Sequence, residues 1–316
     1  MSETLLSALV MAGGLLGRML PFMILGVIAA EFINALGFVN KLSFLARPIT
    51  RFSHLKQECG VSFLMAFGSG VAAYAMLAKY HEDGLISKKE MFLAAMINSF
   101  PGVLLHWRSM LPVVIPLLGT IGLVYFLIFV LIGLVKTALL MIVSRILLPV
   151  TPEPELTAES KPRPPLKEAF KQSLKTSWRI LRRMVLITVP TMLLISILIK
   201  AGVFNGLTTY LSGISAYLPI PASGLSIIAA MFGHSIAAYT VASNLLAAGE
   251  IAAKGIILSL IIGSVFSSTI YMFRDVLPYY VGVFGPKAGM QITLLSSAIR
   301  AGVAIIFVVI LAIFWQ

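Results

Sequence analysis

The chain has 316 residues, of which 59% are hydrophobic and only 11% are charged, and its mean hydropathy is +0.99. Soluble domains carry about 25% charged residues, so this composition excludes a soluble globular protein. It indicates an all-α polytopic membrane protein, because several apolar runs reach the ~20 residues that cross a bilayer and none alternates like a barrel strand.

The net charge of +12 lies largely beside these apolar runs, where basic residues set topology and contact anionic lipid. We therefore expect the lipid bilayer, and not nucleic acid, to be the partner of this charge. The single cysteine, Cys59, excludes an internal disulfide and a cysteine-only metal cluster within one chain. No basic segment precedes the first apolar run, so we expect no cleavable signal peptide.

The first half of the chain, residues 1–148, alternates apolar runs with polar loops. Residues 1–15 are mildly apolar and are expected at the surface, and a basic amphipathic segment is expected at 38–58. The expected membrane segments are 16–37, 59–80, a third span that runs into 98–102, a short, kinked or half-crossing helix at 108–120, and 123–148.

Residues 149–182 differ in composition and are expected to link two transmembrane domains, 1–148 and 183–316. Six prolines between Pro149 and Pro165 predict a stiff linker. Apolar residues then recur every four positions among lysines and arginines, which predicts a basic helix lying on anionic lipid. The alternative is a docking site for a soluble partner. The apolar positions are Leu166, Phe170, Leu174 and Trp178.

An eight-residue motif occurs twice, as Phe-Gly-Ser-Gly-Val-Ala-Ala-Tyr at 67–74 and as Phe-Gly-His-Ser-Ile-Ala-Ala-Tyr at 232–239. The copies are 165 positions apart and share five identical residues. Both lie inside apolar segments, where glycine and small polar residues disfavour a continuous helix. Such a break is tolerated in a membrane where it is buried in protein or lines a wet cavity.

The repeat extends along both halves. At the same offset Gly84 matches Gly249 and Ser99 matches Ser264, and after one inserted residue Arg108 matches Arg274. The basic loop 38–58 is expected in the cytoplasm, whereas the equivalent residues 203–222 lack lysine and arginine and are expected outside. Equivalent loops on opposite faces require an odd number of crossings per repeat.

The sequence therefore predicts two inverted-topology repeats of about five membrane segments each, with interrupted helices and both termini outside. Hydropathy favours five membrane segments in each repeat. The basic linker would then be cytoplasmic, in agreement with the rule on positive charge. Lys79, Lys88 and Lys89 would lie outside, which conflicts with that rule.

The motif at 67–73, followed by Ile97-Asn98-Ser99-Phe100, resembles the Gate (nucleoside-recognition) superfamily. That superfamily includes the membrane domain of the bacterial ferrous-iron transporter and the spore-maturation membrane proteins. The resemblance covers nearly the whole chain, once per half, and implies a multi-pass protein of a prokaryotic inner or plasma membrane. Ser69 stands where the iron transporters place a cysteine, so a soft-ligand ferrous site is not implied.

Polar residues at the helix breaks are the candidate substrate-binding groups. Two breaks are expected in each repeat, at 68–70 and 98–102 and at 233–235 and 263–268, and inverted symmetry would bring them together near the bilayer midplane. The alternative is that these side chains satisfy local backbone groups or hold helices together. The candidates are Ser69, Asn98, Ser99, His234, Ser235, Ser264, Ser267 and Ser268.

His234 is the most specific candidate, because a neutral imidazole inside a span can ligate a metal or carry a proton. A divalent cation bound there is the one cofactor that we consider, and the alternative is a histidine bonded to a broken helix. Glu31 and Asp275 are carboxylates within or near the spans. Structural roles are expected for Arg108 and Arg274, as partners of broken-helix carbonyls or carboxylates, and for Gly68 and Gly233, at the breaks.

No zinc-protease helix, nucleophile elbow or pair of carboxylates at helical spacing is present, so we do not expect an enzyme. The favoured function is a secondary permease that moves a small solute or metal cation through a midplane site between the repeats. The alternative is a non-transporting membrane scaffold that recruits a partner through residues 149–182. A homo-oligomer is compatible with either function.

Overall fold

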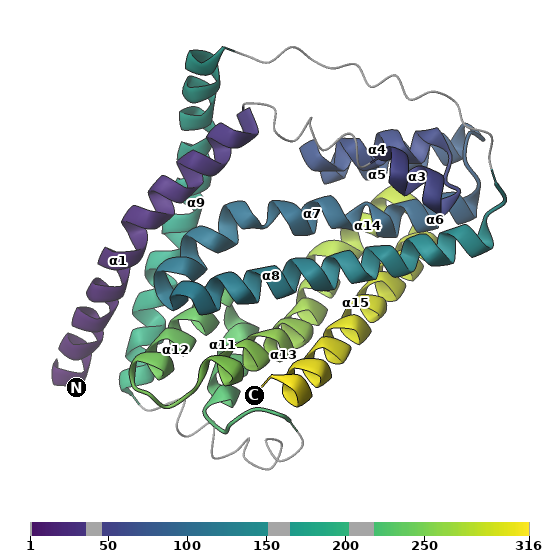
Figure 1. Ribbon diagram of the computed structural model, residues 1–316. Helices are drawn as coiled ribbons and strands as arrows, with labels where there is room; N and C mark the ends of the chain where they lie inside the picture. Colours follow the sequence, from purple (N-terminus) through teal and green to yellow (C-terminus); the bar gives the residue numbers. More distant parts are fainter. Residues whose placement is uncertain (1, 36–45, 151–164, 202–217, 316) are drawn as a thin grey trace.

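The computed structural model describes residues 2–35, 46–150, 165–201 and 218–315, and its regular elements are helices (Figure 1). The expectations for residues 38–45, 151–164 and 203–217 lie outside the described residues. The first half contains α1 (Ser2–Ala35), α3 (Ala46–Ser53), α4 (Gln57–Gly68), α5 (Gly70–Glu82), α6 (Lys88–Ile97), α7 (Ser99–Leu105) and α8 (Trp107–Leu147). The second half contains α9 (Leu166–Lys200), α11 (Gly224–Gly233), α12 (Ser235–Ala247), α13 (Ala253–Tyr271), the π-helix η2 (Met272–Val276), α14 (Leu277–Phe284) and α15 (Pro286–Phe314).

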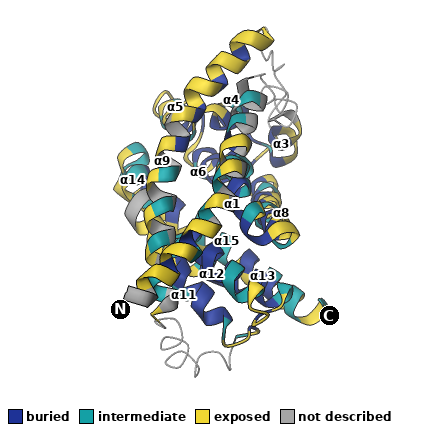
Figure 2. Cartoon of the chain, turned by 90° about the vertical axis from the view of Figure 1, so that its left-hand side faces the viewer, coloured by how far each residue is buried: buried dark blue, intermediate teal, exposed yellow. Residues whose placement is uncertain are grey.

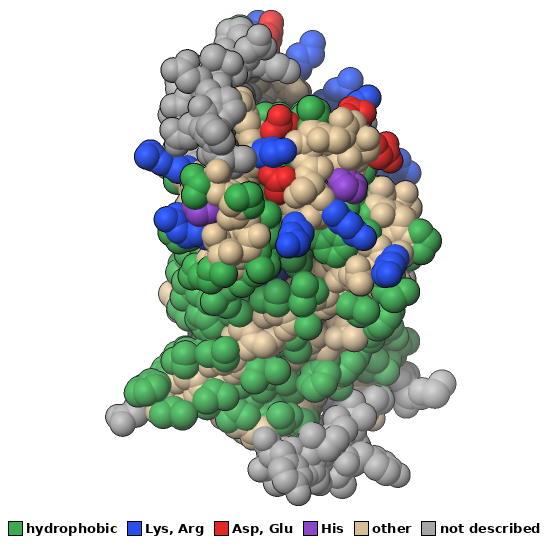
Figure 3. All heavy atoms as spheres, turned by 90° about the vertical axis from the view of Figure 1, so that its right-hand side faces the viewer, with side chains coloured by type: hydrophobic (Ala, Val, Ile, Leu, Met, Phe, Trp, Pro, Cys, Tyr) green, Lys and Arg blue, Asp and Glu red, His purple; other side chains and the backbone are tan. Residues whose placement is uncertain are grey.

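Three described helices, α8, α13 and α15, are long and apolar enough to cross a membrane. They expose large apolar side chains, including Leu131 and Leu134 on α8 and Ile306 and Ile310 on α15. Figure 3 shows these apolar side chains as a broad zone below a charged end of the molecule. Such a zone is typical of a surface that faces lipid. The chain is therefore an all-helical membrane protein.

Two helices run further than the sequence indicated. α1 is continuous from Ser2, so residues 2–15 extend the first expected span and do not form a separate surface segment. α9 joins the basic amphipathic stretch to the apolar stretch that follows it, from Leu166 to Lys200, without an interruption. Leucine, alanine and lysine all favour helix, and α9 has only Pro190 as an internal breaker.

Residues 59–80 do not form a single crossing, because α4 and α5 fold back on each other as a helical hairpin. The Ser62 hydroxyl of α4 donates to the Ala73 carbonyl of α5 at 2.7 Å. At the open end of the hairpin, the Lys56 ammonium donates to the Leu85 carbonyl at 2.8 Å. The chain therefore enters and leaves the hairpin on the same side, and Ser69 forms its tip.

The second motif forms a matching hairpin from α11 and α12, with His234 at the tip. Its open end is held by Ser223, whose hydroxyl donates to the Glu250 carbonyl at 3.2 Å. Residue 223 precedes α11 and residue 250 follows α12, so this contact corresponds to that of Lys56 with Leu85 in the first hairpin. The same hairpin is thus built twice.

Glycines with positive φ angles also occur at equivalent positions in the two halves. Positive φ angles occur at four described glycines, Gly84 (73°) and Gly249 (71°), and Gly119 (56°) and Gly285 (81°). The first pair follows α5 and α12 at the offset of 165. The second pair lies 166 positions apart, where Gly119 kinks α8 and Gly285 separates α14 from α15. The expected kink in residues 108–120 is therefore confirmed, and a chain reversal or kink occurs at corresponding places in both halves.

The π-helix η2 coincides with the one-residue insertion in the second repeat. The offset between the halves is 165 at Ser264 and 166 at Arg274, and η2 covers residues 272–276. A π-turn closes its hydrogen bond from i to i+5 and so holds one more residue than an α-turn. The extra residue is taken up there, and α13 runs through 263–268 without a break. The break predicted at 263–268 was therefore wrong.

The two halves run in opposite directions. In Figure 1, α1 rises from the N-terminus while its repeat partner α9 descends beside it, and α8 and α15 also run opposite ways. The halves also interlock, because Tyr125 of α8 packs on Tyr239 of α12 and Tyr74 of α5 packs on Tyr280 of α14, with ring centroids 6.1 and 4.9 Å apart. The most continuous core surrounds α11, α12 and α13 (Figure 2).

On the face shown in Figure 3, charged side chains gather at one end of the molecule, here called the basic end. Arg145, at the end of α8, donates to the Phe52 carbonyl at 3.1 Å, and the His54 ring meets the Leu148 carbonyl at 3.2 Å. Because the first hairpin returns to its starting side, Lys79, Lys88 and Lys89 lie at this end too. The expectation that these lysines face away from the basic loop was wrong.

α15 connects the basic end to the opposite end. Pro286 shares a surface hollow with His81 and Lys88, whereas Ala312 accepts a hydrogen bond from Lys254 at 3.0 Å. Twenty-nine helical residues at about 1.5 Å each separate these ends by roughly 40 Å, enough to cross a bilayer.

Candidate functional site

The hairpin tips use the same backbone geometry with different side chains. Ser69 (φ −154°, ψ 110°) and His234 (φ −166°, ψ 145°) are both extended, and each ends one helix and caps the next. The Ser69 hydroxyl accepts from the Ala72 amide at 3.2 Å, and the His234 Nδ1 accepts from the Ile236 amide at 3.1 Å. Each side chain thus satisfies an amide that the first turn of a helix leaves without a partner.

The capping role limits what His234 can offer to a metal, because Nδ1 is already an acceptor for Ile236. Among the residues that the structure describes, no group of three or more His, Cys, Asp or Glu side chains is placed to hold a metal ion. A metal-binding or proton-carrying role for His234 stays a prediction. An added Cβ at Gly68 or Gly233 meets no atom within 4 Å, so their structural role is not explained by crowding.

Asn98 ties the second predicted break to the first hairpin. The chain bends mildly at Asn98 (φ −63°, ψ −7°), and Pro101 and Gly102 lie inside α7. The Asn98 amide donates to the Ser62 hydroxyl at 2.7 Å, and Ser62 in turn donates to the Ala73 carbonyl. This buried chain of hydrogen bonds joins α4, α5 and the α6–α7 bend.

Next to Asn98, Ser99 accepts a hydrogen bond from Lys136, a residue that the sequence interpretation missed. Lys136 lies in the C-terminal half of α8 and is 6% exposed, and its ammonium donates to Ser99 Oγ at 2.9 Å and to Ser296 Oγ of α15 at 2.7 Å. Both acceptors are neutral. A lone lysine inside an apolar run of 26 residues was the available signal, because a charge at the bilayer centre costs about 2.5–3.5 kcal/mol on the insertion scale.

A second group of polar residues surrounds Tyr125 of α8. Its ring packs on that of Tyr239 of α12, with centroids 6.1 Å apart, and the two hydroxyls lie near Ser264 of α13 and Ser235 of α12. Two of the predicted site residues, Ser235 and Ser264, are therefore brought together through a pair of tyrosines, one from each half.

Arg300 of α15 links the two groups. Its guanidinium lies over the Phe129 ring of α8 at 5.7 Å, and Arg300 follows Ser296, the α15 acceptor for Lys136, by about one helical turn. The other neighbour of Phe129 is His106, whose ring centroid lies 5.5 Å away. Cation–π contact is a favourable arrangement for a desolvated guanidinium. We call Ser99, Tyr125, Lys136, Tyr239, Ser264, Ser296 and Arg300 the polar centre.

The remaining predicted residues lie outside the polar centre or are not described. Ser267 and Ser268 donate to carbonyls of their own helix, Ser264 and Val265, which matches the alternative that they satisfy local backbone. Arg108 is half-buried in the first turn of α8, and its role stays a prediction. The side chains of Glu31, Arg274 and Asp275 lie outside the described residues.

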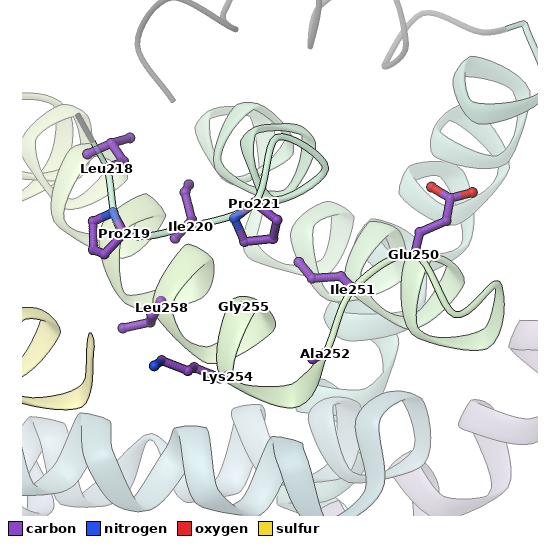
Figure 4. Close-up of a pocket in the computed structure, with 10 residues that line it drawn as sticks. All are labelled: Leu218, Pro219, Ile220, Pro221, Glu250, Ile251, Ala252, Lys254, Gly255 and Leu258. Carbon is purple, nitrogen blue, oxygen red and sulfur yellow. The ribbon is translucent and has the colours of Figure 1, made fainter. Parts of the chain in front are cut away.

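An open hollow of about 530 Å³ lies at the end opposite the basic end (Figure 4). Its lining is mostly apolar, with Leu218, Pro221 and Leu258, and its charged members are Glu250 and Lys254. Lys254 is engaged with the Ala312 carbonyl. The hollow contains none of the predicted site residues, so we place the candidate site at the polar centre and the hairpin tips.

Comparison with known proteins gives a family and no solved structure. The family model described as "Gate: Nucleoside recognition" matches residues 16–121. The chain is similar to three proteins of Methanocaldococcus jannaschii, all described as uncharacterized. MJ1556 is 28% identical over 98% of this chain and 99% of its own length, MJ0871 is 30% identical over 86% of each, and MJ0880 is 24% identical over 92% and 95%. No solved structure matches the chain significantly.

Proposed function

We propose a transport function from one premise: the chain belongs to the Gate family, whose description is nucleoside recognition. We infer that it is a secondary permease of a prokaryotic cell membrane that carries a small solute through a midplane site. The architecture would be two inverted repeats of about five membrane segments each. No catalytic step and no resident cofactor is part of this proposal.

The observation that carries the proposal is the pair of capped hairpins. Ser69 and His234 stand at equivalent tips in halves that run in opposite directions (Figure 1). Interrupted membrane segments at corresponding places in two inverted halves are typical of transporters, which bind solute at the interface between the repeats. Each hairpin closes on itself at its open end, so it can move as one unit against the long helices.

The chemistry of the polar centre also supports a transport function. Ionisable residues in membrane segments mark solute and ion pathways, and Lys136 of α8 donates across to Ser296 of α15, about one turn before Arg300. The predicted residues Ser99, Ser235 and Ser264 belong to or border this centre. In this proposal the tips gate access and the polar centre holds the solute.

The test is uptake by purified full-length protein in proteoliposomes, with radiolabelled uridine, phosphate, succinate and Mn²⁺ supplied one at a time. We expect saturable uptake of at least one solute above the level of empty liposomes. Deletion of residues 151–164 should leave this uptake in place. No uptake of any of these solutes, by protein that is folded and inserted, would contradict the proposal for these solute classes.

One observation favours the second candidate function, a membrane scaffold. The apolar stripe of α9 is exposed rather than packed, and Trp178 is 72% exposed. The other helix face carries the buried small residues Ala169, Ser173 and Ser177. An exposed apolar stripe with lysines beside it fits anionic lipid or a partner helix. Binding of a synthetic peptide of residues 166–182 to anionic vesicles would favour lipid over a protein partner.

A further inference from the structure

We propose that the polar centre binds an anionic group, so that the solute of this protein is a small anion. This assigns a substrate class to the site of the proposed function and rests on that function for the transport step alone. Binding of an anion can be measured whether or not the protein transports.

The first argument is the bonding of Lys136. An ammonium has three donors, and two of them are used by the neutral hydroxyls of Ser99 and Ser296. Among the described residues the one ion pair joins Lys56 and Glu90 at the basic end, so no described carboxylate neutralises Lys136. A buried charge without an opposite charge nearby is the arrangement that a charged ligand completes.

The second argument is the position of Arg300. It adds a second positive charge about one helical turn from Ser296, to which Lys136 donates, and repulsion between like charges is otherwise unfavourable there. A metal cation placed between them would meet two like charges, whereas an anion would be attracted by both. A guanidinium and an ammonium together also suit a carboxylate or phosphate, since the guanidinium binds it through two donors and the ammonium as a point charge.

The third argument is the lining. The hydroxyls of Ser99 and Ser296 contact Lys136, and Tyr125 lies one helical turn from Phe129, the ring under Arg300. Hydroxyls can turn to donate to an anion without cancelling the positive charge. Lys136 is almost fully buried in this structure, so an anion reaches it only when the halves move apart. Such burial separates the centre from lipid headgroups at the surface.

The experiment is a thermal-unfolding titration of the purified full-length protein in a neutral detergent. The probes are inorganic phosphate, sulfate, succinate and uridine 5′-monophosphate, with uridine, Mn²⁺ and phosphatidylglycerol as contrasts. We expect at least one of the four anions to raise the unfolding temperature in a saturable manner. Uridine and Mn²⁺ should not do so.

Three variants and one matched control assign the binding to the centre. Lys136→Met and Arg300→Gln should each weaken the binding of that anion by about 30-fold or more, as expected when one partner of a buried charge pair is removed. Lys136→Arg should keep part of the affinity. Lys254→Met is the control, because Lys254 also donates to a neutral acceptor but lies outside the polar centre, and it should bind like the wild type.

Four outcomes would overturn the inference. They are stabilisation by Mn²⁺ or uridine alone, stabilisation by phosphatidylglycerol alone, equal anion affinity in Lys136→Met and the wild type, and restored stability when Lys136→Met is combined with Asp275→Asn. The last outcome would mean that the protein itself supplies the counter-charge. If the transport proposal alone fails, the anion still binds as described, but proteoliposomes do not take it up.

Discussion

At the scale of single residues, the two hairpin tips show one structural task performed by two side chains. Ser69 and His234 occupy the same extended backbone geometry and cap the following helix through an oxygen in one case and a ring nitrogen in the other. The sequence predicted both breaks, because glycine and small polar residues interrupt an apolar run there. It could not tell whether histidine was chosen for capping or for chemistry.

Replacement of His234 separates these two roles. His234→Ala should lower the free energy of unfolding by about 1 kcal/mol, the usual cost of losing an N-cap, whereas His234→Ser should retain most of it because serine caps the equivalent tip. Chemical unfolding in detergent micelles measures both. If the serine variant is as unstable as the alanine variant, the imidazole does more than cap.

Ser62 is a buried residue whose importance was not visible in the sequence. Its hydroxyl donates to the Ala73 carbonyl and accepts from Asn98, so Ser62→Ala leaves two buried polar groups without their partner. We expect a loss of about 1–3 kcal/mol of stability in the same unfolding measurement. Ser109→Ala is the control, since its exposed hydroxyl bonds locally within α8, and it should change stability by less than about 0.5 kcal/mol. Equal effects of the two variants would contradict the assigned network.

At the scale of elements, hydropathy found the apolar segments but misread how two of them fold. Residues 59–80 have the length of a span, and nothing local to the run distinguishes a broken crossing from a hairpin. The difference is made by pairing across the tip, through Ser62 and Ala73, and by Lys56 at the open end. The break expected at 263–268 failed for the opposite reason, because serines that bond to their own helix leave it continuous.

The glycine pair at 119 and 285 gives a test at this scale. Their angles, φ 56° with ψ −131° and φ 81° with ψ 164°, lie where side chains other than glycine are strained. Gly119→Ala and Gly285→Ala should each destabilise the protein by about 1–3 kcal/mol, although a Cβ meets no atom within 4 Å at either site. Gly302→Ala, inside α15 with equally open surroundings, should be neutral or stabilising. Thermal unfolding of the three variants measures these changes in stability. Similar losses in all three would show that the effect does not come from the positive φ angles.

At the scale of the whole molecule, the hairpins resolve the conflict in the charge pattern. Once residues 59–80 are a hairpin, the lysines around residues 79–89 lie with Lys56 and Arg145 at the basic end, as positive residues on one membrane face should. The sequence repeat was readable because equivalent residues recur at a nearly constant offset. The polar centre was not, because Lys136, Arg300 and Tyr125 come together only when α8 and α15 pack.

Topology can be tested at two equivalent loops that follow the hairpins. On a Cys59→Ser background, a cysteine at Glu250 should react with a membrane-impermeant maleimide added to intact cells, and a cysteine at Glu82 should react only after lysis. Both positions are exposed, and they lie at opposite ends of the molecule. Labelling of both from the same side would refute the inversion, and the reversed pattern would refute the orientation only.

The interlocking of the halves has a historical consequence. Tyr74 and Tyr125 each find their ring partner in the other half, so neither half completes its own packing. A half-length ancestor would have met that need by pairing with an oppositely inserted copy of itself, and gene fusion would then have fixed one copy in each orientation. Only after fusion could the copies diverge, and they have: Lys136 and Arg300 correspond to Gly302 and Leu134 at the offset of 166. The two cations of the polar centre therefore have no basic counterpart in the other half, and the centre does not follow the repeat.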